Sequence, residues 1–335
     1  MTKNKLFIVV LTICIISMLM GFLTPFINKS DNNAKPNNTK QKTNLSKLMN
    51  PNKVAVIGLN GVINSTPENN IFIEENSSLV ALKALNEAEN DDTVKGVILR
   101  INSPGGTVGM SQRLYSAVMH VRAKKPVIAV LDDIAASGGY YVASAADRIV
   151  ALEGTMTGSI GVIMSTTDAH ELLTNKLGIS QNVIKSGKYK DIGSSTRAMT
   201  SEERKLLQDM VNDSYQQFKT AITNGRIKRD DKYEVAKTNL TPQNLNKYAD
   251  GRIFTGRQAK KLGFVDSTGG NREAKDMMTK ILEKKGISKD IVDFVDYGKN
   301  NSFLSSLGLN QKTSVLDGLV PASVKYARKP LYLWE

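Results

Sequence analysis

The chain has 335 residues, of which 41% are hydrophobic and 23% charged, and its formal net charge at pH 7 is +13. These values exclude a disordered chain and fit one large globular core with appendages. The basic residues lie among acidic ones, and neither a zinc-finger spacing nor an aromatic RNA-binding signature occurs, so we expect no nucleic-acid partner. The net positive charge is better explained by attraction to an acidic membrane surface. The single cysteine, Cys14, rules out an intramolecular disulfide and a cysteine metal site.

The amino-terminal region, residues 1–27, is predicted to be a transmembrane anchor. A short basic head precedes an apolar run from Leu6 to about Leu23, which as a helix nearly crosses a hydrocarbon layer of about 30 Å. The basic head favours a cytoplasmic amino terminus, so the rest of the chain is expected outside the cell membrane. Residues 28–50 are rich in Asn, Lys and Thr and are predicted to be a flexible polar linker.

Two alternatives to an uncleaved anchor fit these residues less well. A cleaved signal peptide needs small residues before the cut, and no A-x-A pattern is present. A lipoprotein signal would use Cys14, but the bulky Ile13 precedes it where a small residue is expected.

The remainder alternates β-branched apolar runs with stretches of helical spacing. In chain order, strands are expected at residues 54–59, 95–101, 126–131, 148–151 and 160–164. Helices are expected at residues 78–90, 107–124, 137–146, 201–224 and 258–262. Continuous apolar strands that alternate with helices indicate an α/β fold, with a mainly parallel sheet flanked by helices and functional loops at the strand ends.

Further signals concern the boundaries of the domain and one helix. Thr200 and Glu203 have the spacing of a capping box for the helix that starts at residue 201. Residues 51–270 are assigned to the core and 271–335 to a carboxyl-terminal extension. The extension ends in the apolar, aromatic segment Leu331 to Trp334, which either docks on the protein or membrane or is a frayed terminus.

Ser137 is the candidate nucleophile. It lies between Ala136 and Gly138 at the expected start of a helix, where free N–H groups and small neighbours suit a developing oxyanion. The alternative is a plain helix N-cap, a common role of serine. The preceding Ser103-Pro104-Gly105-Gly106 segment offers a second source of N–H groups, or else is only a tight structural turn.

A serine nucleophile needs a base, and a lysine is the best candidate here. The chain has only two histidines, His120 and His170, and neither lies close to the polar segment some fifty residues after the serine that carries Lys185, Lys188 and Lys190. A lysine amine has an ordinary pKa of about 10.4, so burial has to lower this pKa by roughly three units. Spacing alone does not choose among the three lysines.

Five segments in order resemble those of the bacterial signal peptide peptidase A family, in its short, single-domain form. Together they cover about residues 54–266, and the ordered set is far more specific than any one of them. They are Arg100-Ile101-Asn102-Ser103-Pro104-Gly105-Gly106, Ala135-Ala136-Ser137-Gly138-Gly139-Tyr140-Tyr141, Thr157-Gly158-Ser159-Ile160-Gly161-Val162, Ser186-Gly187-Lys188-Tyr189-Lys190-Asp191 and Asp250-Gly251-Arg252-Ile253-Phe254-Thr255-Gly256-Arg257-Gln258-Ala259.

This resemblance implies a ClpP/crotonase-like fold and a catalytic dyad of Ser137 with Lys190. It also implies that Ser159 helps to hold the lysine amine and that the backbone N–H groups of Gly106 and Gly138 bind the oxyanion. No cofactor and no metal is implied. No matched position is substituted, so an active enzyme is expected.

The resemblance further implies a membrane-anchored serine endopeptidase that degrades the signal peptide remnants left by signal peptidase. It implies a homo-oligomeric ring of eight subunits in which neighbouring subunits supply the serine and the lysine of one site. Two rival functions are a crotonase-like enzyme acting on acyl-CoA and a non-catalytic membrane scaffold that forms rings.

Overall fold

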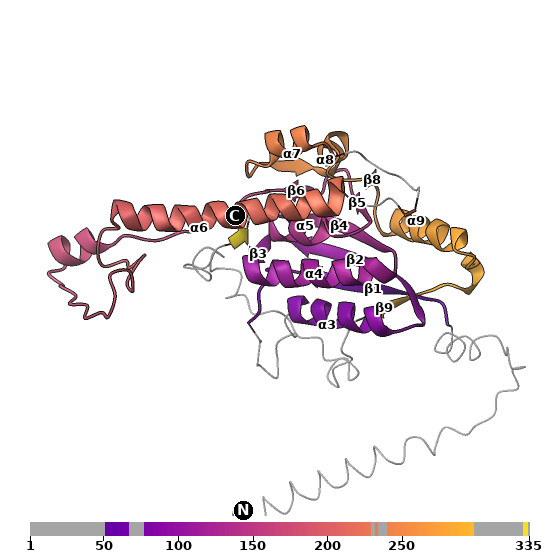
Figure 1. The fold of residues 1–335 in the computed structure, drawn as a ribbon, viewed down its shortest axis with the longest axis horizontal. Helices are drawn as coiled ribbons and strands as arrows, with labels where there is room; N and C mark the ends of the chain where they lie inside the picture. The colour runs from indigo at the N-terminus through magenta and orange to yellow at the C-terminus, as the bar shows by residue number, and fades with distance from the viewer. Residues whose placement is uncertain (1–50, 67–76, 229–231, 234–239, 298–330, 334–335) are drawn as a thin grey trace, which may run out of the picture. The chain divides into compact units, whose positions relative to one another are not determined.

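A computed structural model describes residues 51–66, 77–228, 232–233, 240–297 and 331–333 (Figure 1). The predicted anchor at 1–27 and linker at 28–50 lie outside the described residues. Within the described ranges, no helix combines the length and the apolar character that a membrane crossing requires.

The described chain is built on a mainly parallel sheet, as predicted. Its strand order is β7-β6-β4-β2-β1-β9, with β5 beside β4 and β8 beside β5. Only the β6–β7 pair is antiparallel within this sheet. The strands are β1 (Lys53–Asn60), β2 (Val94–Ser103), β4 (Val127–Ala136), β5 (Arg148–Ala151), β6 (Met156–Gly158), β7 (Ile253–Thr255), β8 (Ser267–Thr268) and β9 (Asp293–Tyr297).

Helices pack against both faces of the sheet because side chains of a strand alternate between its faces. In β1, Ala55 and Ile57 belong to the larger buried cluster, whereas Val54 belongs to the smaller one. The larger cluster includes residues of α3 (Ser77–Asn90), α4 (Val108–Lys124) and α5 (Gly138–Ala143), and the smaller one residues of α9 (Asn271–Lys284). The predicted α/β arrangement with covered faces is therefore confirmed, and it is consistent with a ClpP-like fold.

The long helix α6 (Ser201–Ile222) begins with the predicted capping box, in which Thr200 and Glu203 bond each other's backbone N–H. It meets the core near its carboxyl end, where the ring of Phe218 lies 4.9 Å from that of Tyr141 in α5. The amino half of α6 extends beyond α5 (Figure 1). The shorter helices α7 (Pro242–Tyr248) and α8 (Gly256–Leu262) follow it.

Two local predictions are wrong. No strand forms over 160–164: the strand there is β6, which ends at Gly158 because the backbone turns through positive φ at Gly158 (89°) and Ser159 (48°). The segment predicted as a turn at 103–106 instead continues into a short strand, β3 (Gly105–Thr107).

Residues beyond 270 contribute to the same sheet, since β9 pairs with β1. The end of the chain also pairs with the core: β10 (Leu331–Leu333) runs antiparallel to β3 and places Tyr332 opposite Gly106. The carboxyl-terminal segment thus docks on the protein along these three residues.

Candidate active site

Ser137 lies between the end of β4 and the start of α5, at the carboxyl edge of the parallel strands. Its backbone has φ 52° and ψ −117°, a conformation that costs a non-glycine residue free energy and persists only where surrounding contacts impose it. One such contact is the Ser137 N–H, which donates to the Gly158 carbonyl at 2.8 Å. The neighbouring strand therefore holds the serine in a strained position.

The Ser137 hydroxyl is buried and has no hydrogen-bond partner within the described residues. Although Ser137 occupies the N-cap position of α5, its side chain makes no capping bond. A buried hydroxyl without a partner is costly, so a purely structural N-cap role does not account for it. The hydroxyl is left available for a reacting group.

The two glycines predicted to bind an oxyanion lie side by side next to this serine. A Cβ atom placed on Gly138 would lie 3.2 Å from the Gly106 nitrogen and 2.5 Å from Ser111 Oγ, so the close approach leaves no room for a side chain. The Gly105 carbonyl accepts from Ile63 N (2.7 Å) and Thr107 N donates to the Ile63 carbonyl (2.8 Å). Because alternate residues of a strand direct their polar groups to opposite edges, the Gly106 N–H is directed away from Ile63, toward the edge where β10 pairs.

Ser159 is also held close to Ser137 by backbone contacts. It follows Gly158, whose carbonyl binds the Ser137 N–H, and its own N–H donates to the Arg252 carbonyl at 2.8 Å. Ser159 is 6% exposed and, like Ser137, has a positive φ. The structure therefore brings together four of the five predicted site residues.

Lys190, the fifth, lies elsewhere in the same chain. It is part of residues 163–210, which we call the arm and which consist of the segment before α6 and the amino-terminal half of that helix (Figure 1). At about 1.5 Å per residue, that end lies about 25 Å along the helix axis from Phe218, the level at which α5 packs. Lys190 is exposed, and its amine has no partner within the described residues.

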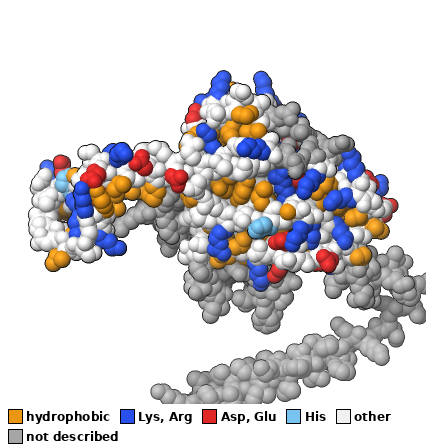
Figure 2. Space-filling view, viewed as in Figure 1, with side chains coloured by type: hydrophobic (Ala, Val, Ile, Leu, Met, Phe, Trp, Pro, Cys, Tyr) orange, Lys and Arg blue, Asp and Glu red, His pale blue; other side chains and the backbone are white. Residues whose placement is uncertain are grey.

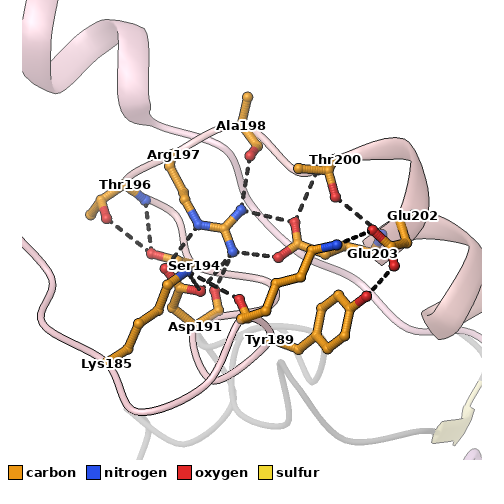
Figure 3. Close-up of polar contacts among 11 residues, drawn as sticks. Lys185, Tyr189, Asp191, Ser194, Thr196, Arg197, Ala198, Thr200, Glu202 and Glu203 are labelled. Carbon is orange, nitrogen blue, oxygen red and sulfur yellow. Dashed lines mark hydrogen bonds and ion pairs between the residues drawn. The ribbon is translucent and has the colours of Figure 1, made fainter.

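Polar contacts fasten the turn that carries Lys190 to α6 (Figure 3). Arg197 binds both carboxylate oxygens of Asp191, at 2.8 and 2.9 Å, and it also binds both oxygens of Glu203 in the first turn of α6. Lys185 adds a bond of 2.6 Å to Asp191. These hydrogen bonds from Arg197 and Lys185 hold the pKa of Asp191 well below its usual range, and Arg197 lowers the pKa of Glu203 to about 2.

Neither histidine contacts the Ser137 hydroxyl, which has no hydrogen-bond partner within the described residues. His170 lies on the arm, where Nδ1 is 2.6 Å from an Asp168 oxygen. No cluster of three or more His, Cys, Asp or Glu side chains suited to a metal ion occurs in the part of the chain that the structure describes.

A strained serine between a strand and a helix, next to glycine N–H groups, is typical of hydrolases that use a serine nucleophile. Residues 119–286 match the description "Peptidase family S49". The chain therefore belongs to peptidase family S49, and within it to the SppA type.

Three relatives illustrate this similarity. A provisionally named protease of Methanocaldococcus jannaschii is 39% identical over 65% of this chain and 64% of its own length, so the match leaves more than a third of that protein uncovered. A provisionally named signal peptide peptidase SppA of Enterococcus faecium is 34% identical over 80% of this chain and 73% of its own. The chloroplastic serine protease SPPA of Arabidopsis thaliana is 32% identical over 65% of this chain and 31% of its own.

The sequence did not indicate Arg197 as part of this region. The spacing of Thr200 and Glu203 predicted their capping box, but no sequence pattern indicates that Glu203 also binds an arginine six residues earlier. The pairing of β10 with β3 could not be predicted either, because no local sequence signal specifies a strand partner more than two hundred residues away.

Proposed function

We propose that this protein is a serine endopeptidase with Ser137 as nucleophile and Lys190 of a neighbouring copy as base. The observation that carries the proposal is Ser137, which has a strained backbone and a buried hydroxyl without a hydrogen-bond partner within the described residues, next to Gly138 and close to Gly106. Membership of a peptidase family supports the reaction class.

Exposed apolar side chains support a second copy as the source of the lysine. Of the eleven large hydrophobic residues exposed within the described ranges, eight lie on the arm, and Ile184 is fully exposed. Figure 2 shows such side chains along the arm, at the left of the view. Clustered exposed apolar surface marks a protein contact, and the arm also carries Lys190. We propose a closed ring of eight copies in which each arm reaches the next copy's serine.

The proposed reaction is acyl transfer to the serine. Neutral Lys190 takes the proton of the Ser137 hydroxyl as its oxygen attacks a peptide carbonyl, and the Gly106 and Gly138 N–H groups bind the resulting oxyanion. Lys190 then gives this proton to the leaving amine as the C–N bond breaks. Water hydrolyses the acyl-enzyme, with Lys190 again acting as base, and frees Ser137. In this scheme Ser159 helps to hold the lysine amine.

The proposed substrates are signal peptide remnants in the membrane. This proposal relies on the predicted anchor at 1–27 and on the name of the Enterococcus relative. It places the catalytic domain outside the cell membrane, next to the bilayer that holds such remnants.

Cleavage of peptides by the full chain in lipid vesicles tests the proposal. The substrates are a random peptide library and a synthetic signal peptide embedded in the vesicles, and products are identified by mass spectrometry. We expect cleavage of both by the wild type and of neither by Ser137→Ala. Turnover of acyl-CoA thioesters without peptide cleavage would favour the crotonase-like alternative, and a Ser137 that no serine-reactive probe labels would favour the scaffold.

The docked end of the chain leads to a separate prediction. Because β10 occupies the edge of β3 toward which Gly106 directs its N–H, it competes with any substrate that adds there as a strand. Deleting residues 331–335 is expected to raise kcat/KM for short peptides about 3- to 10-fold. A variant with five Gly and Ser residues in their place should behave alike; unchanged kcat/KM in both variants would contradict the prediction.

A further inference from the structure

The Arg197 ion pairs join the turn that carries Lys190 to the first turn of α6, and Lys188 and Tyr189 join the same two segments through Glu202. Lys188 and Tyr189 both bind the Glu202 carboxylate, and these contacts are exposed. Arg197 is more central: its guanidinium bridges Asp191, which directly follows Lys190, and Glu203, which is 3% exposed. It also donates to the Ala198 carbonyl at 3.1 Å. A planar guanidinium with two carboxylate partners fixes direction as well as distance.

The same contacts connect the turn that carries Lys190 to the first turn of α6. Glu203 accepts from Arg197 and also from the Thr200 N–H, at 2.9 Å, as part of the capping box. On the other side, the turn is closed by Lys190 N, which donates to the Gly187 carbonyl, and Ser194 N, which donates to the Asp191 carbonyl. A displacement of Arg197 is therefore expected to displace the backbone of Lys190.

Charge balance around Lys190 depends on the same arginine. In the central cluster, the cations Lys185 and Arg197 face the anions Asp191 and Glu203, so the two signs cancel. The outer pair of Lys188 and Glu202 is also balanced. The charged or titratable groups in these contacts are Lys185, Lys188, Tyr189, Asp191 and Arg197 on the turn that carries Lys190 and the following loop, and Glu202 and Glu203 on α6.

We propose that Arg197 is a positioning residue for Lys190: it fastens the turn that presents the amine and cancels the carboxylate charge beside it. This inference relies on the proposed role of Lys190 as base. Without Arg197, the carboxylates of Asp191, the residue after Lys190, and of Glu203 lose a compensating cation, and the added negative charge favours the protonated amine, which cannot act as base. Without Glu203, the positive charge of Arg197 is less compensated and favours the neutral amine.

These opposite effects allow a test that distinguishes a positioning role of Arg197 from a purely structural one. We measure kcat, KM and the pH dependence of kcat/KM for peptide cleavage by the full chain. Arg197→Gln is expected to lower kcat roughly 10- to 100-fold with little change in KM, because a small displacement of a catalytic group is costly. The acid limb of its pH profile of kcat/KM should move to higher pH by about half a unit, and the acid limb for Glu203→Gln should move to lower pH by a similar amount. In the double variant the two shifts should cancel while kcat remains low.

The controls separate this inference from the proposed function. Lys205→Gln removes one cation from an exposed pair with Asp209 on the same helix and should leave kcat and the acid limb unchanged. Circular dichroism and native mass spectrometry check folding and assembly, and Glu203→Gln, which can still cap the helix, keeps the test open if Arg197→Gln fails to fold. Suppose that Arg197→Gln and Glu203→Gln both keep the wild-type kcat and the wild-type acid limb while Lys190→Ala is inactive. This result would overturn the role of Arg197 and leave Lys190 as the proposed base. Full activity of Lys190→Ala would overturn both this role and the proposed base.

Discussion

Replacement of Ser137 by alanine is expected to lower peptide cleavage at least about 1,000-fold while the protein stays folded. The loss follows from removal of the attacking oxygen. Stability should change by less than about 1 kcal/mol, because the hydroxyl makes no hydrogen bond to the described part of the chain and alanine carries the same backbone strain at φ 52°. Release of a fluorescent group from a peptide measures the rate, and urea unfolding measures the stability.

Lys190→Ala is expected to give a similar loss, because no other group then takes the serine's proton. Lys188→Ala, which affects the exposed pair with Glu202, is the matched control and should retain most activity. Lys185→Ala also removes a partner of Asp191 and should lower activity, but less than Lys190→Ala does. Full activity in Lys190→Ala together with complete loss in Lys188→Ala or Lys185→Ala would move the base to that lysine. Activity in all three would exclude a base on this turn.

Mixing Ser137→Ala chains with Lys190→Ala chains is expected to restore activity that neither has alone. If each site takes its serine from one copy and its lysine from the next, a random equal mixture has both groups in about one quarter of sites. The expected rate is therefore about a quarter of that of the wild type. The mixture has to be unfolded and refolded together, so that copies exchange between assemblies.

Separately refolded variants, mixed afterwards, serve as the control and should stay inactive as long as assemblies do not exchange copies. No recovery after joint refolding, in particles shown by native mass spectrometry to contain both variants, would argue for sites formed within one chain. That outcome would require the arm to fold back by about 25 Å toward its own serine.

The sequence predicted the parts of this fold that depend on local pattern. The apolar run at 148–151 became β5 without change, and the Thr200–Glu203 spacing became a capping box. It failed where the backbone departs from regular geometry, as at Gly158 and Ser159, since positive φ at a serine has no local signature. Side-chain spacing also did not show that Lys190 lies far from Ser137, because the length of α6 separates the two.

The candidate site was predicted largely through resemblance. Residue chemistry alone left Ser137 with an ordinary N-cap as its alternative and left three lysines open. The structure adds that the Ser137 hydroxyl makes no capping bond, and it brings Gly106, Gly138 and Ser159 to the same serine. The base remains a prediction, and in the proposed function it is supplied by a neighbouring copy.

The separation of Ser137 from the arm of its own chain has a consequence for biosynthesis. On the proposed shared site, a newly made chain carries a hydroxyl that nothing deprotonates and an amine that has nothing to deprotonate. Proteolysis would then begin only when copies have assembled. The spacing set by one helix would keep a single newly made chain from cleaving peptides.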